Sequence, residues 1–295
     1  MSWVPPLLVI LAANIAAQTS GEPSVAADAT VLITGTRGNL GGKLAAALTS
    51  TYPLRCLDLL GGGDCIAADL ASFDESWAQH FRGVQTVLHF AGEPRPTAPW
   101  SLVHRANIVA TANVLRASRM HAVRRVIFAS TNQVMAGYRY SDGLITTDLS
   151  PTPLNPYAVS KLCCEEAGRA FAAETGVSFI AFRIGNIQPG ENVPRPSMGI
   201  GLWGQQMWLS NRDFVQGVRA AILAPNVSFA LLNLVSNNPG MRWDMTETER
   251  ILGFSPEDGF TPSLSSEDVA EEQMARLARL VPGQWLDQRF RPMRG

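Results

Sequence analysis

The apolar positions of the chain fall into short strand patterns that alternate with longer helical patterns. Runs rich in β-branched and aromatic residues predict strands at 30–34, 54–58, 86–90, 125–130 and 178–184. Apolar residues at helical spacing predict helices near 40–49, 72–82, 100–119 and 156–174. This alternation is typical of βαβ units, so we expect an α/β fold with a doubly wound, mostly parallel sheet.

The pattern changes in the last third of the chain. A loop rich in glycine and proline leads to an expected helix at 211–223, a strand at 228–236 and a polar helix at 266–280. We interpret residues 29–186 as the sheet domain and residues 187–295 as a small C-terminal cap. Ligands of such folds bind at the carboxyl ends of the strands, so the cap is expected to close over that edge and bind the substrate.

Composition narrows the classes of function. Hydrophobic residues make up 46% of the chain and charged residues 17%, which suits a compact enzyme and argues against a disordered protein. The formal net charge of −1 leaves no basic surplus for phosphates, so we expect no nucleic acid partner. The four cysteines lack the spacing of metal ligands, so we predict core thiols and no metal site.

A glycine-rich loop gives the first chemical signal. Gly35, Gly38 and Gly41 follow the first expected strand and open the first helix with the spacing G-x-x-G-x-x-G. Glycine permits the sharp turn, the close approach of a pyrophosphate and the close packing of helix on strand. The helix N-terminus supplies N–H groups and a positive dipole end to the phosphates. We therefore predict a Rossmann-type, dinucleotide-binding domain.

An acidic residue in the second strand bears on the choice of cofactor. Asp58 ends that strand 23 residues after Gly35, where a carboxylate can bind both hydroxyls of an adenosine ribose. Such a carboxylate repels the 2′-phosphate of NADP, so NAD is the predicted cofactor and NADP the alternative. Arg37 would contact that phosphate, pair with Asp58 or stay solvated. Asp69, closing an expected third strand, suits either the adenine amine or a structural role.

The first 28 residues are expected to precede the fold. Residues 4–17 are a 14-residue apolar run that ends in small residues, as the apolar region and cleavage site of a signal peptide do. The run is too short to span a membrane, and it contains no Lys or Arg. Because dinucleotide-dependent enzymes normally work inside cells, we expect a cytoplasmic protein, with export through a signal peptide in residues 1–17 as the alternative.

Five short segments occur in the order TGTRGNLG, HFAG, ASTNQV, YAVSK and FRIGN. Together they resemble the extended short-chain dehydrogenases/reductases of the NAD-dependent epimerase/dehydratase family. The later segments WLSNRDF, LLNLVSNNPGMRWD and LGFSPEDG are most similar to those of uronate dehydrogenases. The resemblance covers about residues 30–260, and it implies NAD-dependent oxidation of a hydroxyl group in a sugar or sugar acid.

The resemblance implies that Tyr157 is the catalytic acid/base and that Lys161 assists it. At positions i and i+4 of a helix, the phenol and the ammonium share one face. There the ammonium and a positive nicotinamide would favour the phenolate. Asn155 suits the N-cap of this helix. Thr131 stands where the family usually has serine and is the expected third catalytic residue, with Ser130 as the fallback.

The resemblance also implies cofactor and substrate contacts. Asn107 is similar to a helix asparagine that supports the active-site lysine. Substrate contacts are expected from Asn132, Asn186 and Arg195, while a turn-forming Asn132 and a solvated Arg195 remain open alternatives. Small residues in HFAG would let the cofactor backbone pass close by. The predicted cofactor contacts are Gly35, Arg37, Gly38, Asn39, Leu40, Gly41, Asp58, Asp69, Leu70, Phe90, Ala91, Gly92, Asn107 and Ile184.

The expected reaction is hydride transfer from a sugar hydroxyl to NAD, with Tyr157 taking the proton and Thr131 orienting the oxygen. A nucleotide-sugar epimerase would use the same residues, although the expected cap is short for a nucleotide diphosphate. A non-catalytic NAD-binding sensor is a further alternative, but it predicts loss of Tyr157 or Lys161, and both are present. The resemblance also implies a homodimer formed through the helices near 100–119 and 156–174.

Overall fold

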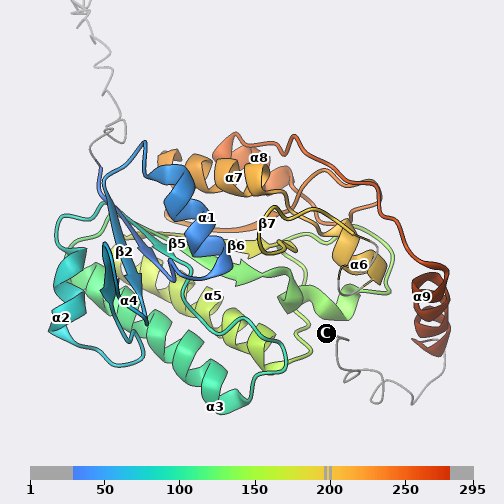
Figure 1. Cartoon of the computed structure of the whole chain (residues 1–295), viewed down its shortest axis with the longest axis horizontal. Coiled ribbons are helices and arrows are strands. Elements are labelled where there is room, and N and C mark those ends of the chain that lie inside the picture. The colour runs from blue at the N-terminus through green and yellow to red at the C-terminus, as the bar shows by residue number, and fades with distance from the viewer. Residues whose placement is uncertain (1–28, 196–197, 199–200, 280–295) are drawn as a thin grey trace, which may run out of the picture.

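The computed structural model describes residues 29–195, 198 and 201–279, and its centre is a seven-stranded sheet between two layers of helices (Figure 1). The strands run in the order β3-β2-β1-β4-β5-β6-β7, and every neighbouring pair is parallel. The chain order reverses between β1 and β4, where ligands of doubly wound sheets bind. The predicted Rossmann-type α/β fold is confirmed.

The observed elements agree closely with the apolar pattern. The strands are β1 (Val31–Thr34), β2 (Leu54–Asp58), β3 (Cys65–Ala67), β4 (Thr86–His89), β5 (Arg125–Thr131), β6 (Ser178–Ile184) and β7 (Phe229–Leu234). The longer helices are α1 (Asn39–Leu48), α4 (Ala110–Met120), α5 (Pro156–Thr175), α7 (Asn211–Leu223) and α9 (Ser266–Arg279). The shorter helical segments are α2 (Glu75–Ala78), η1 (Gln79–Phe81), α3 (Trp100–Val103), η2 (His104–Val109), η3 (Asn132–Tyr138), α6 (Gly201–Gln206) and α8 (Thr246–Leu252).

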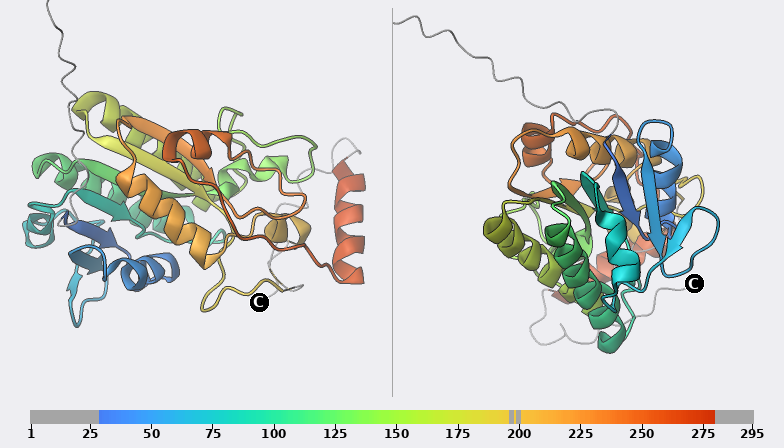
Figure 2. Two further views of the ribbon diagram at one scale, coloured as in Figure 1. Left: turned by 90° about the horizontal axis from the view of Figure 1, so that it is seen from above. Right: turned by 90° about the vertical axis from the view of Figure 1, so that its left-hand side faces the viewer.

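Alternate strand residues face two separate apolar layers. Val31 and Ile33 of β1 belong to the core shared with α1, α7 and α8, whereas Leu32 belongs to the core shared with α2, α4 and α5. Figures 1 and 2 show these two sets of helices on opposite faces of the sheet. Because both faces are covered, every residue of β1, β4, β5 and β6 is buried.

The structure differs from the expected division of the chain at β7. This strand was expected in a separate cap, but it pairs in parallel with β6 from Phe179↔Phe229 to Ile184↔Leu234 and completes the sheet. Helix α7 likewise packs on the sheet core. Apolar patterning predicts a buried strand without specifying which strand pairs with it. Helices α6 and α9 and the loops around them remain as the part beyond the carboxyl edge (Figure 1).

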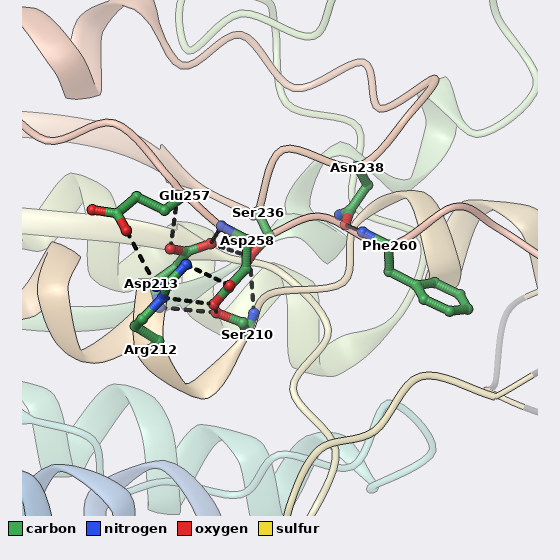
Figure 3. A network of polar contacts seen from close by, with 8 residues as sticks. All are labelled: Ser210, Arg212, Asp213, Ser236, Asn238, Glu257, Asp258 and Phe260. Carbon is green, nitrogen blue, oxygen red and sulfur yellow. Dashed lines mark hydrogen bonds and ion pairs between the residues drawn. The ribbon is translucent and has the colours of Figure 1, made fainter.

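A polar network ties the segment after α8 to the carboxyl end of β7 (Figure 3). Asp213 is 1% exposed and accepts hydrogen bonds from the Ser236 hydroxyl (2.5 Å). It also accepts the backbone N–H groups of Glu257 and Asp258, at 3.0 and 3.1 Å. Ser210, the N-cap of α7, donates its hydroxyl to Asp258 (2.6 Å). These donors compensate the buried carboxylate and fix the segment on the sheet.

The expectations for the leader and the thiols have different outcomes. Residues 1–28, the expected leader, lie outside the described residues. Across the parts of the chain that the structure describes, no helix combines the length and apolar character needed to cross a membrane. All four cysteines have free thiols. Cys164 is buried as expected, whereas Cys163 is exposed and Cys56 and Cys65 are partly exposed, so the expectation of core thiols is right for one of four.

Arg125 joins three elements at the amino end of the sheet. Its buried guanidinium donates to the Ser178 hydroxyl (2.9 Å) and to the carbonyl oxygens of Ala221 and Ile222 in the last turn of α7, at 2.7 and 3.1 Å. The last carbonyl groups of a helix have no partner within it, and a cation is favourable there. Burial lowers the pKa of Arg125 to about 10, so its charge persists at neutral pH.

We expect Arg125→Met to lower the free energy of unfolding by about 3 kcal/mol, because two buried carbonyl groups lose a charged donor. The exposed neighbour offers a matched control, and Arg124→Met should change the free energy of unfolding by less than about 0.5 kcal/mol. Urea unfolding of both variants and the wild-type protein measures the difference. Equal effects of the two substitutions would show that Arg125 does not cap α7.

Candidate active site

The glycine loop packs against the end of β4 at the carboxyl edge of the sheet. Gly35 has φ +77°, and a Cβ there would lie 2.6 Å from the backbone nitrogen of Ala91. A Cβ on Gly41 would lie 2.1 Å from the carbonyl oxygen of Gly35. Both positions therefore require glycine. Gly38 is the N-cap of α1 without a side-chain cap from the described residues, so the first N–H groups of α1, including those of Asn39 and Leu40, suit an anion.

Asp58 and Arg37 are neighbours, but they do not form the ion pair considered from the sequence. Asp58 accepts the backbone N–H of Arg37 (2.9 Å). The Arg37 guanidinium instead donates to the carbonyl oxygens of Leu60, Gly61 and Gly62, at 2.7, 2.9 and 3.1 Å. Because backbone carbonyls of the β2–β3 loop hold the guanidinium, the negative charge of Asp58 is not neutralised by it. This arrangement favours a ribose diol over a 2′-phosphate at Asp58.

The carboxylate of Asp69 contacts other residues of the protein. One carboxylate oxygen accepts the backbone N–H of Ala71 (3.1 Å), and the other pairs with Arg105. The next residue, Leu70, is buried, and its carbonyl oxygen accepts the side-chain amide of Asn113 (2.8 Å). Of the two roles considered for Asp69, these contacts favour the structural one.

His89 and Thr34 connect the ends of β4 and β1. The buried imidazole bonds through Nδ1 to the Thr34 hydroxyl (2.8 Å) and through Nε2 to the Thr111 hydroxyl (3.0 Å). The Thr34 oxygen also accepts the N–H groups of Phe90 and Ala91, at 3.2 Å each. Burial and, secondly, a neighbouring lysine lower the pKa of His89 to about 3, so the ring is neutral. His89 is thus a structural residue that fixes the backbone of HFAG.

Tyr157, Lys161 and Thr131 come together at the carboxyl end of β5. Asn155 caps α5 by accepting the N–H of Ala158 (2.8 Å), as predicted, and this puts Tyr157 in the first turn. Thr131 is the last residue of β5, and its side chain hydrogen-bonds the phenol of Tyr157. The Lys161 nitrogen lies 5.9 Å from the centre of the Tyr157 ring. The structure therefore assembles the three groups that the resemblance implied.

Burial sets the ionisation of this pair. Tyr157 is 9% exposed and Lys161 is 5% exposed. Desolvation raises the pKa of Tyr157 to about 12, and the hydrogen bond with Thr131 opposes the rise. Desolvation lowers the pKa of Lys161 to about 8, while Cys164 and Glu165 act in the opposite direction. At neutral pH the phenol of Tyr157 keeps its proton, and Lys161 is charged in most molecules. The phenol therefore needs further positive charge nearby to become a base.

Asn107 lies in the π-helical segment η2 and connects two backbone segments near Lys161. Its side-chain oxygen accepts the N–H of Glu93 (2.7 Å), and its amide nitrogen donates to the Glu93 carbonyl oxygen (3.2 Å) and the Ser160 hydroxyl (2.8 Å). Ser160 donates in turn to the carbonyl oxygen of Tyr157 (2.7 Å). Asn107 thus positions the first turns of α5, which carry both proposed catalytic groups.

The neighbours of Thr131 in the chain have contrasting surroundings. Ser130 donates its hydroxyl to Glu165 (2.5 Å), so the fallback role of Ser130 as the catalytic hydroxyl does not fit the structure. Asn132 is 1% exposed, and neither polar atom of its amide has a partner among the described residues. Of the buried side chains described, it is the one with two unpartnered polar atoms. A buried amide without partners is costly, so this one suits a ligand.

The other predicted contacts end β6 or follow it. Ile184 is buried as the last residue of the strand. The side-chain oxygen of Asn186 accepts the amide of Gln188 (2.6 Å), so its side chain is engaged within its own loop. Arg195 is exposed in the same loop. The structure therefore does not bring Arg195 into the buried group around Tyr157.

Two tryptophans that could have stacked on a sugar ring are packed in the core instead. Trp203 lies against Trp243, with ring centres 4.5 Å apart. Trp208 donates its ring N–H to the carbonyl and side-chain oxygens of Asn192, at 3.1 Å each. Both tryptophans are buried. Their packing indicates a structural role for both residues.

A buried ion pair that was not predicted from the sequence lies on α5 and β6. Glu165 of α5 and Arg183 of β6 pair at 2.9 Å with both side chains buried. A signal was present, because Glu165 continues the i, i+4 series of Tyr157 and Lys161 and puts a third polar group on the buried face of α5. The role of Thr34 had no comparable signal, since a threonine ending a strand is common.

Comparisons with known proteins identify the family of the chain. The model of the NAD dependent epimerase/dehydratase family matches residues 31–196. L-arabinose 1-dehydrogenase (NAD(P)(+)) of Haloferax volcanii is 31% identical over 249 residues, covering 78% of this chain and 97% of that protein. Uronate dehydrogenase of Pseudomonas syringae pv. tomato is 28% identical over 235 residues, covering 77% of this chain and 82% of that protein.

The crystal structure of uronate dehydrogenase from Agrobacterium tumefaciens superposes with a TM-score of 0.67 at 25% identity, covering 87% of this chain and 91% of that chain. The predicted cofactor, NAD, and the predicted enzyme class, a dehydrogenase acting on CH–OH groups, agree with these relatives. The match of the family model and the extent of the similarity identify this chain as a member of the NAD dependent epimerase/dehydratase family.

Proposed function

We propose that this protein is an NAD-dependent dehydrogenase that oxidises a hydroxyl group of a sugar or sugar acid, with Tyr157 as the base. The observation that carries the proposal is the grouping of Tyr157, Lys161 and Thr131, with the buried amide of the next residue, Asn132, lacking a partner among the described residues. The activities named for the relatives, on L-arabinose and on uronates, support the substrate class.

The residues at the strand ends fit a dinucleotide. The close contact between the glycine loop and the end of β4 leaves backbone in place of side chains where a pyrophosphate would lie, and the N-terminus of α1 would bind it. Asp58 would bind the adenosine ribose, and Lys161 would bind the nicotinamide ribose. When bound, NAD accepts the hydride and contributes a positive charge.

The phenol of Tyr157 is the group that handles the proton. The hydrogen bond with Thr131 already opposes the effect of burial on its pKa. The ammonium of Lys161, 5.9 Å from the centre of the ring, would favour the phenolate further. In the oxidation, the phenolate oxygen of Tyr157 takes the proton of the sugar hydroxyl. Thr131 meanwhile donates a hydrogen bond to the oxygen of that sugar hydroxyl and orients it. In the reverse direction, the protonated phenol is the donor, and its pKa of about 12 keeps it protonated.

The polar groups beyond the sheet edge would orient the substrate. Asn132 offers one acceptor and two donors that a sugar hydroxyl can satisfy. Arg195, if drawn inward, would provide the planar pair of donors that a carboxylate prefers. For a uronate oxidised at C1, the product would be an aldonolactone. Asn186, which stands where uronate dehydrogenases typically carry serine, would make the binding site differ from theirs.

A panel of uronates and aldoses tests the proposal through the absorbance of NADH. We expect net NADH from at least one sugar, and Tyr157→Phe should lower kcat by about 10²–10⁴-fold because the proton acceptor is lost, while NAD affinity is retained. Tyr52→Phe, a buried tyrosine remote from Thr131 in the α1 core, is the matched control. Full activity of Tyr157→Phe would refute the role of the phenol, and isomerised sugar without net NADH would indicate an epimerase.

The carboxylate of Asp58 should select NAD. We expect Asp58→Ala to weaken NAD binding by about 10-fold or more, in line with the 1.5–3 kcal/mol typical of a charged hydrogen bond, and to reduce the preference over NADP. Asp64→Ala removes an exposed carboxylate from the β2–β3 loop, which follows Asp58, and should leave both affinities unchanged. Fluorescence titration with both cofactors measures the effect. Unchanged NAD affinity in Asp58→Ala would remove Asp58 from the cofactor site.

We expect the buried amide of Asn132 to lower the stability of the folded protein and to bind the substrate. We expect Asn132→Leu to raise the free energy of unfolding by about 1–3 kcal/mol, because an unpartnered buried amide is removed, and to abolish sugar oxidation. Asn238 is a buried asparagine whose amide donates to the Gln206 and Trp208 carbonyl oxygens, so Asn238→Leu should be destabilising. Thermal unfolding and NADH assays measure both effects. A destabilised Asn132→Leu variant with normal turnover would contradict this role.

A further inference from the structure

Glu165 and Arg183 form a buried ion pair that is held by a third residue. Arg183 donates through Nη2 to one carboxylate oxygen (2.9 Å) and through Nε to the other (3.1 Å). The second oxygen also accepts the Ser130 hydroxyl (2.5 Å). The two charged side chains are 0% and 1% exposed, and no other ion pair among the described residues has both partners buried. A pair buried this deeply depends on geometry of this quality.

The network connects the elements that carry the proposed catalytic groups. Glu165 lies on α5 one turn after Lys161 and two turns after Tyr157, on the buried face of the helix. Ser130 directly precedes Thr131 on β5. A displacement of Glu165 would therefore move the helix with the phenol and the lysine relative to the strand with Thr131.

Glu165 also affects the ionisation of Lys161. The imidazole of His89, facing from β4, is neutral because its pKa is about 3. The thiol of Cys164 is buried, which raises its pKa, and the phenol of Tyr157 has a pKa of about 12, so both are neutral at pH 7. Glu165 is thus the anion that acts on the ammonium from these surroundings, and its charge opposes the effect of burial.

The network also contains a positive charge, that of Arg183. Arg183 lies on β6 and contacts the sulfur of Met135 through Nη1 (3.2 Å) in addition to its two bonds to Glu165. Removing the carboxylate alone would leave this guanidinium buried without its counter-ion. Both changes in charge, the lost anion and the uncompensated cation, would disfavour a charged Lys161.

We propose that Glu165 is a positioning residue that, locked by Ser130 and Arg183, holds α5 in register with β5 and provides the negative charge that keeps the Lys161 ammonium ionised. A contribution of Glu165 to turnover rests on the proposed function. The effect on Lys161 is a property of the protein by itself, and it can be measured without substrate or cofactor.

The chain is suited to a direct test because it contains two lysines, Lys43 and Lys161. Lysine labelled with ¹³C at Cε gives one NMR signal for each, and Lys43→Arg assigns them. Lys43 lies on α1, far along the chain from α5, and serves as the internal reference. We expect the wild-type Lys161 signal to titrate near pH 8, as its pKa of about 8 requires.

Glu165→Gln should lower the pKa of Lys161 by about one pH unit or more, that is, raise its acid dissociation constant at least about 10-fold. Glu166→Gln is the matched control, since Glu166 is the next residue on α5 and pairs with Arg169 in solvent, 60% and 51% exposed. It should leave the titration of Lys161 unchanged. The Lys43 signal should titrate at the same pH in all three proteins.

A folded Glu165→Gln variant whose Lys161 titrates as in the wild-type protein would overturn the proposal, and so would an equal shift in Glu166→Gln. If the single variant unfolds, Glu165→Gln with Arg183→Met removes the pair as a unit, which buried pairs tolerate better. A smaller lowering of the Lys161 pKa is then expected, from the lost anion alone, and an unchanged pKa would overturn the proposal. The proposed function fails separately, through the sugar panel and Tyr157→Phe, because the lysine titration does not depend on turnover.

Discussion

The parallel register of the central strands determines where every candidate group lies. Thr34 of β1 pairs with His89 of β4, and Thr131 of β5 pairs with Ile184 of β6, so all four strands end at the same edge. Residues that immediately follow these strands must share that edge, however far apart they are in the sequence. The glycine loop, HFAG and Asn132 meet for this reason, and α5 brings its phenol to the same edge.

Much of the fold could be predicted because the central strands are buried on both faces. Such strands are runs of apolar and β-branched residues, and the expected strand at 178–184 has the observed bounds. The partly buried strand at 54–58 and the helix at 211–223 also have the expected bounds. The partner of the strand at 228–236 could not be predicted, since pairing with β6 depends on contacts across the fold rather than on the local pattern. A third strand closing at Asp69 was expected, and β3 is present, but with three residues, none of them fully buried, it was too short a signal for its bounds to be predicted.

Site residues could be predicted where their spacing in the sequence indicates a shared role. Contacts that depend on burial between distant segments could not be predicted. The i, i+4 spacing of Tyr157 and Lys161 is visible in the sequence, but the pairing of Glu165 with a residue on β6 is not. Ser130 and Thr131 looked interchangeable as hydroxyl donors. Both hydroxyls have partners on α5, so the local sequence could not decide between them, and the structure shows that Ser130 bonds to Glu165 while Thr131 acts on the phenol of Tyr157.

The scaffold of this protein and its candidate site differ in how far the burial of their polar groups is compensated. The carboxylates of Asp213 and Glu165 receive several donors each, so their burial is compensated within the fold. At the strand ends the balance is different, because burial works against the phenolate of Tyr157 and the ammonium of Lys161, and the amide of Asn132 has no partner among the described residues. A ligand that brings a positive charge would favour the phenolate, and its sugar hydroxyls could bond to the amide of Asn132 and accept from the ammonium of Lys161. Such a ligand would stabilise the folded protein by the same interactions that prepare it for proton transfer.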